Sequence, residues 1–153
     1  MDTISGIPAH ALLVHGIVVL APLTALLVIL CALWPAARRR LVWLVVAFAV
    51  VTTVLTPLTT SAGEWLLEHG GPPRPILQEH AERGEWMIYF SVAMLIVAGA
   101  LAALHWMEGR SDKPRKAAAA MLAVVALLVG VSSIITVVRI GDSGAQAVWG
   151  DRG

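Results

Sequence analysis

Four long apolar stretches alternate with short polar stretches along this chain. The apolar stretches cover approximately residues 8–34, 41–61, 85–107 and 117–138. Because a helix of about 20 apolar residues crosses the hydrocarbon core of a bilayer, each stretch predicts a transmembrane helix. The sequence therefore predicts an all-α fold, an integral membrane four-helix bundle in which residues 1–153 form a single domain.

The polar stretches between the predicted helices differ in charge. The first and third are basic, and together they contain Arg38, Arg39, Arg40, Arg110, Lys113, Arg115 and Lys116. The second, from Glu64 to Glu85, is mainly acidic and contains a Gly-Gly-Pro-Pro run that interrupts any helix. Short basic connections remain on the cytoplasmic side of a membrane. We therefore expect both termini on the extracytoplasmic side.

Each apolar stretch also carries small residues at helical spacing, which allow membrane helices to approach closely. These stripes should face the interior of the bundle. Their members are Ala11, Val18, Pro22, Ala25 and Ala32, then Ala49, Thr53, Thr56 and Thr60, then Gly84, Met87, Ser91, Ala98 and Ala102, then Ala119, Ala123, Ala126, Gly130 and Ser133. His15, Glu64 and His80 fall on the same stripes, so we expect these three side chains to point inward.

The composition supports a membrane location and excludes several classes of function. The chain is 58% hydrophobic and 14% charged, with a mean hydropathy of +0.81, which is too apolar for a soluble domain. A formal net charge of +1 argues against nucleic acid binding, which requires a basic face. Cys31 is the only cysteine, so neither an intrachain disulfide nor a thiolate metal site is expected. Only Asp2 is charged before Arg38, which favours a retained first helix over a cleavable signal.

Several ionisable residues gather at the predicted extracytoplasmic end. Counting ~1.5 Å per residue along each helix places His15 and Glu64 at similar depth, near the outer edge of the hydrocarbon. His10 and His80 form a second layer just above them, and Arg139 ends the last helix in the same zone. Ionisable groups at this depth pair with each other, line a cavity or hold a ligand.

Imidazole is the commonest metal ligand in proteins and a usual axial ligand of haem iron. His10 with His80, or His15 with His80, are therefore candidate pairs for haem b, and Glu64 could join histidines around a single zinc, copper or iron ion. A purely structural interpretation is also open, in which each imidazole only donates an internal hydrogen bond. His10 and His15 lie about 140° apart on an ideal helix, so the sequence does not select between them.

Four segments make the chain resemble a known bacterial membrane family. They are GIPAHALLVHGIVVLAPL (6–23), LTTSAGEWLLE (58–68), QEHAERGE (78–85) and VVRIGDSGAQAVW (137–149). The first resembles the "HPLLVH" start of the family catalogued as domain of unknown function 2231 (DUF2231), and the others resemble its actinobacterial members. The resemblance covers nearly the whole chain.

The resemblance implies a topology and a set of residues rather than an activity. The family's paired histidines correspond to His10 and His15, and its third-helix histidine to His80. Ala11 stands here where the family usually has proline. Some relatives are fused to Rieske-type iron–sulfur or cytochrome c domains, which implies redox work at the outer membrane face.

The leading hypothesis is a multi-pass protein of the bacterial cytoplasmic membrane that binds haem b, or a single transition-metal ion, and transfers electrons at the extracytoplasmic face. His15 and His80 would be the ligands, with His10 as an alternate, and Glu64 and Arg139 would support them. Partners would be the lipid bilayer, an extracytoplasmic redox protein and further copies of the chain.

Two other functions stay open: a structural or assembly subunit of a larger membrane complex, and an oligomeric proton or metal-ion permease. The chain has no Walker loop, Rossmann glycine motif, H-E-x-x-H motif or nucleophile elbow. We therefore expect an electron-transfer or accessory protein rather than a bond-making enzyme.

Overall fold

The computed structural model describes residues 3–4, 7–72, 74–111 and 114–150, so Asp2 and Lys113 lie outside the described residues. A two-residue antiparallel pairing of β1 and β2 precedes the helices. The elements in chain order are β1 (Thr3–Ile4), β2 (Ile7–Pro8), α1 (Ala9–Leu33), α2 (Pro35–His69), α3 (Pro75–Glu85), α4 (Met87–Glu108) and α5 (Lys116–Trp149).

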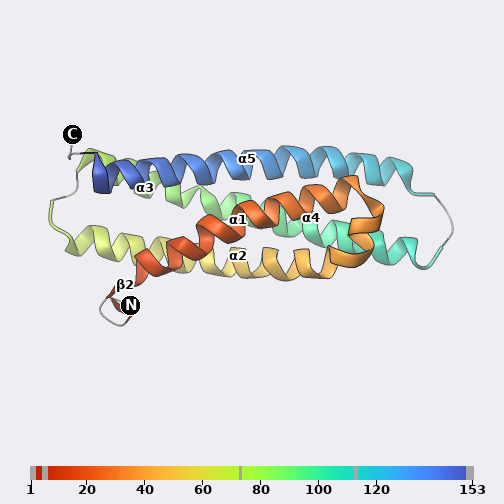
Figure 1. The fold of residues 1–153 in the computed structure, drawn as a ribbon, viewed down its shortest axis with the longest axis horizontal. Helices are drawn as coiled ribbons and strands as arrows, with labels where there is room; N and C mark the ends of the chain where they lie inside the picture. The colour runs from red at the N-terminus through yellow and green to blue at the C-terminus, as the bar shows by residue number, and fades with distance from the viewer. Residues whose placement is uncertain (1–2, 5–6, 73, 112–113, 151–153) are drawn as a thin grey trace.

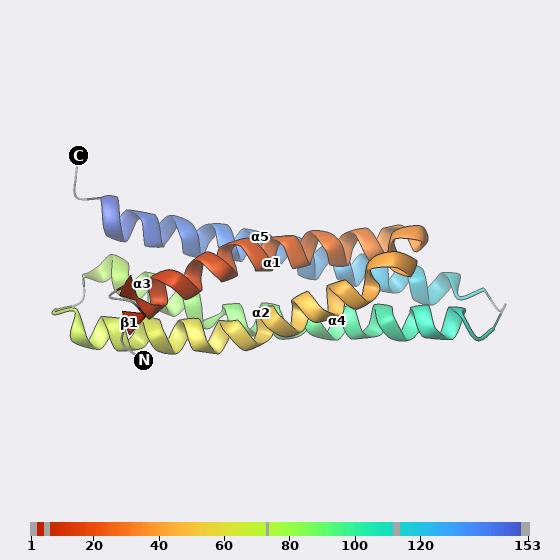
Figure 2. The same ribbon diagram turned by 60° about the horizontal axis from the view of Figure 1, so that its bottom comes forward.

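The long helices α1, α2, α4 and α5 form an antiparallel bundle (Figures 1 and 2). Helix α1 packs against α2 and α5, and α4 packs against the same two helices from the other side. Helix α3 leads into α4 and lies along the last turns of α5. Four helical segments, with α3 and α4 counted together, are long and apolar enough to cross a membrane, which confirms the predicted fold class.

The two ends of the bundle carry different chemistry. The start of α1, the end of α2, α3 and the end of α5 meet at one end, which we call the histidine end because it holds His10, His69 and His80 (Figure 1). The end of α1, the start of α2, the end of α4 and the start of α5 meet at the other, which we call the arginine end because it holds Arg38, Arg39 and Arg40. The start of α1 and the end of α5 therefore lie at the same end of the bundle, the histidine end.

The first connection is shorter than expected. Trp34 alone separates α1 from α2, with extended backbone angles (φ −123°, ψ 103°), and Pro35 begins α2. Proline disfavours the α conformation in the preceding residue, so the turn falls at Trp34. The predicted basic loop is therefore absent, and the three arginines lie on the first turns of α2.

Helices α2 and α5 both continue beyond the predicted spans. Helix α2 runs to His69, and α5 runs to Trp149 through Gly141 and Gly144. Glycine weakens a helix by about 1 kcal/mol relative to alanine, so these two glycines do not themselves favour the extension beyond the predicted span. The contact between α3 and this part of α5 stabilises the helical form instead.

The core divides into two clusters of buried side chains. The cluster nearer the arginine end contains Val28, Cys31, Ala32, Val42, Val45, Ala49, Val97, Ala98, Leu101, Ala102 and Ala126. The cluster nearer the histidine end contains Ile17, Ala21, Ala25, Met87, Met94 and Val137. Gly130 sits where α5 crosses α1, because a Cβ built there would lie 2.7 Å from Ile29 Cδ1. The small-residue stripes therefore mark the real contact faces of α4 and α5.

The threonine hydroxyl groups of α2 form hydrogen bonds within the bundle. The hydroxyl groups of Thr53, Thr56 and Thr59 each donate to the carbonyl four residues earlier, at 2.8 Å. Thr52 Oγ1 lies 3.3 Å from Thr24 Oγ1 of α1. Such back-bonding satisfies hydroxyl groups inside an apolar bundle.

Candidate functional site

His10, in the first turn of α1, is held against α2. Its Nδ1–H donates to the Thr59 carbonyl oxygen at 2.9 Å. A Cβ built on Gly63 would lie 2.9 Å from this Nδ1, so only glycine at this position lets the ring lie so close to the α2 backbone. Because a carbonyl can only accept, the proton of neutral His10 resides on Nδ1, and Nε2 keeps a free lone pair.

His80, on α3, is held against α5 in the same way. Its Nδ1 lies 3.0 Å from the Ile140 carbonyl oxygen and 3.2 Å from Ser143 Oγ. A Cβ built on Gly144 would lie 3.0 Å from the His80 Cε1, so a second glycine makes room for this ring. The hydrogen bonds again use Nδ1, which leaves Nε2 of neutral His80 as the available nitrogen.

The two imidazole rings meet across the histidine end. Their centroids are 6.2 Å apart and their planes are inclined by 87°. Metal–nitrogen bonds of about 2.0 Å place the centres of two imidazoles that share one ion roughly 5–6 Å apart. Histidine ligands in metal sites usually donate the other ring N–H to a carbonyl or carboxylate, as both rings do here. The pair therefore has the Nδ1 hydrogen bonding of histidine metal ligands, with ring centroids slightly farther apart than this range.

The structure does not place His15 and Glu64 as predicted. His15 is exposed on α1 and bonds through Nδ1 to the carbonyl of Ala11 in its own helix. Glu64 is exposed on α2, one residue beyond the glycine that contacts His10. Helix α1 is apolar on every side, so hydrophobicity alone did not reveal its inward face. The structure brings His10, not His15, to His80.

Arg139 also lies outside the histidine pair. Its side chain is exposed, and its carbonyl oxygen accepts a hydrogen bond of 3.4 Å from Arg83 of α3. Among the described residues, neither Glu64 nor Arg139 forms an ion pair with the other. Any supporting role at the histidine end would require both side chains to reach a ligand from the exposed surface.

Sequence reasoning missed the residues that position the two rings. Thr59, Gly63, Ile140, Ser143 and Gly144 supply the carbonyl acceptors and the close backbone approach. Backbone acceptors leave no trace in a sequence. The glycines were a usable signal, because each lies at the polar end of an apolar helix at the level of a histidine.

The number of donors at this site is small. Within the described ranges, no group of three or more His, Cys, Asp or Glu side chains is placed to hold one metal ion. A protein zinc site normally supplies three or four ligands. Haem iron takes its equatorial nitrogens from the porphyrin and at most two axial ligands from the protein. The donor set of His10 and His80 fits an ion that needs only two protein nitrogens.

The arginine end holds a second polar cluster, which the sequence did not predict. Arg38 is only 1% exposed, and its Nη2 donates to Glu108 Oε1 and Oε2 at 2.8 and 3.1 Å. Its Nη1 donates to the Cys31 carbonyl oxygen at 3.2 Å. Arg38 is one of the basic residues that we expected on the cytoplasmic side, and its hydrogen bonds link the end of α1 and the start of α2 to the end of α4.

Exposed tryptophans mark both ends of the bundle. Trp34, Trp43 and Trp106 are exposed at the arginine end, and Trp86 and Trp149 at the histidine end. Trp65 is partly buried and stacks on His69, with ring centroids 4.4 Å apart. Tryptophan prefers the headgroup level of a bilayer, so these positions fit two interfacial belts.

Comparison with known proteins gives one match. A search of curated proteins and a search of solved structures found no similar protein. A family model described as "Predicted membrane protein (DUF2231)" matches residues 6–153, which is nearly the whole chain. The match includes all the helices and both histidines of the pair. The chain therefore belongs to the DUF2231 family of predicted membrane proteins.

Proposed function

We propose that the protein binds a redox-active metal between His10 and His80, as haem b or as a single transition-metal ion, and exchanges electrons with a partner at the histidine end. One observation carries the proposal. Two imidazoles from different helices lie 6.2 Å apart, and each uses Nδ1 for a hydrogen bond. Both Nε2 atoms are therefore the nitrogens available for coordination.

Haem b is the preferred cofactor because two protein nitrogens complete the coordination of haem iron. A single copper or iron ion would need further ligands from water or from a second copy of the chain, and a zinc ion would need them too but would not transfer electrons. Bound haem would supply a one-electron couple. The chain's own residues orient the imidazoles: the carbonyls of Thr59 and Ile140 accept the Nδ1–H of each ring and fix its orientation and tautomer.

The charge distribution supports an extracytoplasmic location for this site. The arginine end carries Arg39 and Arg40 on α2, together with Arg110, Arg115 and Lys116 beside the last connection. Basic residues next to membrane helices favour the cytoplasmic side. We place the histidine end and both termini outside the cytoplasm, in a bacterial inner membrane, where a soluble redox partner could reach the site. Glu64 and Arg139 are exposed at this end and are available to such a partner or to a haem propionate.

The decisive experiment is absorption spectroscopy with metal analysis of the detergent-purified protein, expressed with haem precursor supplied. We expect a Soret band and, after dithionite reduction, sharp α and β bands. His10→Ala and His80→Ala should each abolish these bands. His15→Ala is the matched control, because His15 is exposed on the same helix as His10 and should leave the spectrum unchanged.

Other outcomes separate the alternatives. A featureless spectrum with about one metal ion per chain, lost in the same two variants, would identify a single-ion site. A featureless spectrum without bound metal would refute the proposal. Loss of the bands in His15→Ala but not in His10→Ala would show that the geometric assignment is wrong.

A structural or assembly subunit is the second candidate, and one observation favours it. The hydrogen bond of His10 links α1 to α2, and that of His80 links α3 to α5, so both imidazoles already have structural partners. In that case His10→Ala and His80→Ala would lower thermal stability and would leave association with a larger complex intact once folding is restored at low temperature. A cofactor signal dependent on both residues would exclude this as their sole role.

A further inference from the structure

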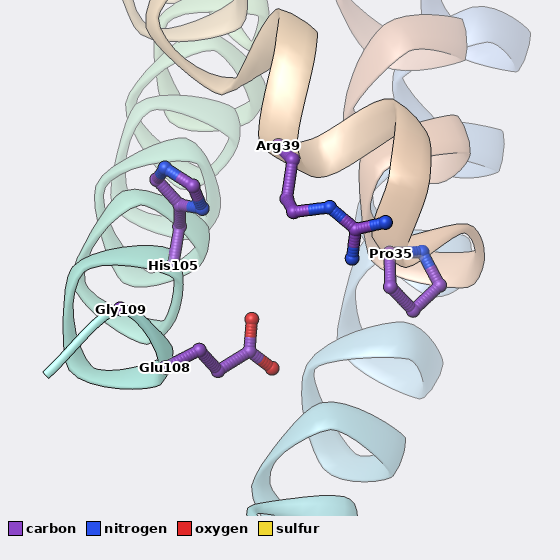
Figure 3. Close-up of a pocket in the computed structure, with 5 residues that line it drawn as sticks. All are labelled: Pro35, Arg39, His105, Glu108 and Gly109. Atoms are coloured by element: carbon purple, nitrogen blue, oxygen red, sulfur yellow. The ribbon is translucent and has the colours of Figure 1, made fainter. Parts of the chain in front are cut away.

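A polar pocket opens at the arginine end, between the first turns of α2 and the last turn of α4 (Figure 3). Its volume is about 270 Å³, and it is lined by Pro35, Arg39, His105, Glu108 and Gly109. This corresponds to roughly nine water molecules at ~30 Å³ each. The pocket is therefore large enough for a charged head group and lies far from the histidine pair.

The charges around this pocket sum to a positive value. The buried guanidinium group of Arg38 neutralises the Glu108 carboxylate, because it donates hydrogen bonds to both carboxylate oxygens. Arg39 extends from the first turns of α2 toward Pro35, and His105 and Glu108 line the pocket from the last turns of α4 (Figure 3). Within the described part of the chain, Arg39 makes no ion pair. Among the described residues, this guanidinium group therefore has no carboxylate partner and can receive an anion.

The pocket lies at the level of the membrane surface. Trp34, which directly precedes Pro35, and Trp106, on the last turn of α4, are both exposed. The Arg110 guanidinium carbon lies 3.8 Å from the centre of the Trp106 ring, so a further cation borders this region. The neighbouring Leu33 is exposed and apolar, next to where acyl chains would lie. Phosphate head groups occupy this depth in a bilayer.

We propose that this pocket binds the phosphate group of an anionic phospholipid, with Arg39 as the principal contact. A planar guanidinium group donates two parallel hydrogen bonds to phosphate oxygens. Basic pockets between membrane helices are a recognised mode of binding to acidic lipid head groups. The bound lipid would pack against the turn at Trp34 between α1 and α2, and it would link this turn to the end of α4.

The test compares neighbouring arginines. Delipidated protein is incubated with mixed micelles of phosphatidylglycerol and phosphatidylcholine, and retained lipid is counted by native mass spectrometry. We expect selective retention of phosphatidylglycerol by the wild type and about a fivefold loss of its affinity in Arg39→Gln. Arg40→Gln removes the same charge from an exposed residue outside the pocket lining, so its affinity should stay within about twofold of the wild type. Circular dichroism confirms that each variant is folded.

Three results would overturn the proposal. Equal losses in Arg39→Gln and Arg40→Gln would show general charge attraction rather than a site. Equal retention of phosphatidylcholine and phosphatidylglycerol would remove the anionic selectivity. Displacement of the lipid by millimolar inorganic phosphate would identify free phosphate, not a lipid, as the ligand.

Discussion

Replacing Glu108 by glutamine should destabilise the bundle through Arg38. The guanidinium group of Arg38 is almost completely buried (1% exposed), whereas the side chain of Glu108 is 34% exposed. Glu108→Gln keeps the size of the side chain and removes its charge. The buried guanidinium group then keeps only the Cys31 carbonyl and a neutral amide oxygen as acceptors.

The structure sets the size of this effect. Removing one partner of a buried ion pair costs about 3–5 kcal/mol, because the other charge remains buried without compensation. Two features reduce that value here: solvent reaches the carboxylate, and the glutamine oxygen still accepts one hydrogen bond from Arg38. We therefore expect a loss of about 2–3 kcal/mol in the free energy of unfolding.

The assay is reversible unfolding of the detergent-purified protein in sodium dodecyl sulfate, followed by circular dichroism. Glu64→Gln removes an exposed carboxylate that has no ion pair among the described residues, so its loss should stay below about 0.5 kcal/mol. The double variant Arg38→Leu/Glu108→Leu should be more stable than Glu108→Gln, because no buried charge remains. A loss below about 0.5 kcal/mol in Glu108→Gln would refute the assignment of Arg38 as a buried, carboxylate-dependent cation.

Three further predictions concern the histidine pair and the helix crossing. Gly63→Ala should weaken binding of haem or of a metal probe by about tenfold, because its Cβ would lie 2.9 Å from His10 Nδ1 and displace the ring; titration of the purified variant checks this. Cofactor binding should also weaken in acidic solution, because protonated imidazole cannot coordinate a metal, and a titration series from neutral to acidic pH would contradict this if affinity stayed constant. Gly130→Leu should lower the free energy of unfolding by about 1–3 kcal/mol, because even its Cβ would lie 2.7 Å from Ile29 Cδ1. Gly99→Leu is the control for that measurement, since a Cβ at Gly99 has no neighbour within 4 Å and should leave stability nearly unchanged.

The contact faces of α4 and α5 could be predicted from the sequence. Ser91 and Ala98 on α4, and Ala126, Gly130 and Ser133 on α5, are buried as their spacing indicated. Small residues stand out among the large apolar side chains that face the lipid, so spacing alone reveals the packed face. The same reasoning failed for the first half of α1, where Ala11 and Val18 are not buried. Nearly every residue there is apolar, and no contrast marks the inward side.

The position of each polar group depended on contacts that a sequence does not show. His10 and His15 are equivalent candidates in the chain, and only the approach of Gly63 on α2 brings His10 inward. Arg38 is one of three consecutive arginines, and the one-residue turn at Trp34 places it alone in the interior beside Glu108.

Length, hydropathy and charge therefore determined by themselves that this is a membrane bundle of four long helices with chemically different ends. These properties are local or periodic, and the bilayer imposes the helical form on any apolar stretch of sufficient length. Only the tertiary structure decided which histidine meets His80 and which arginine is buried. Those outcomes depend on the rotation of each helix about its axis, which packing between backbones sets and which hydropathy leaves undefined.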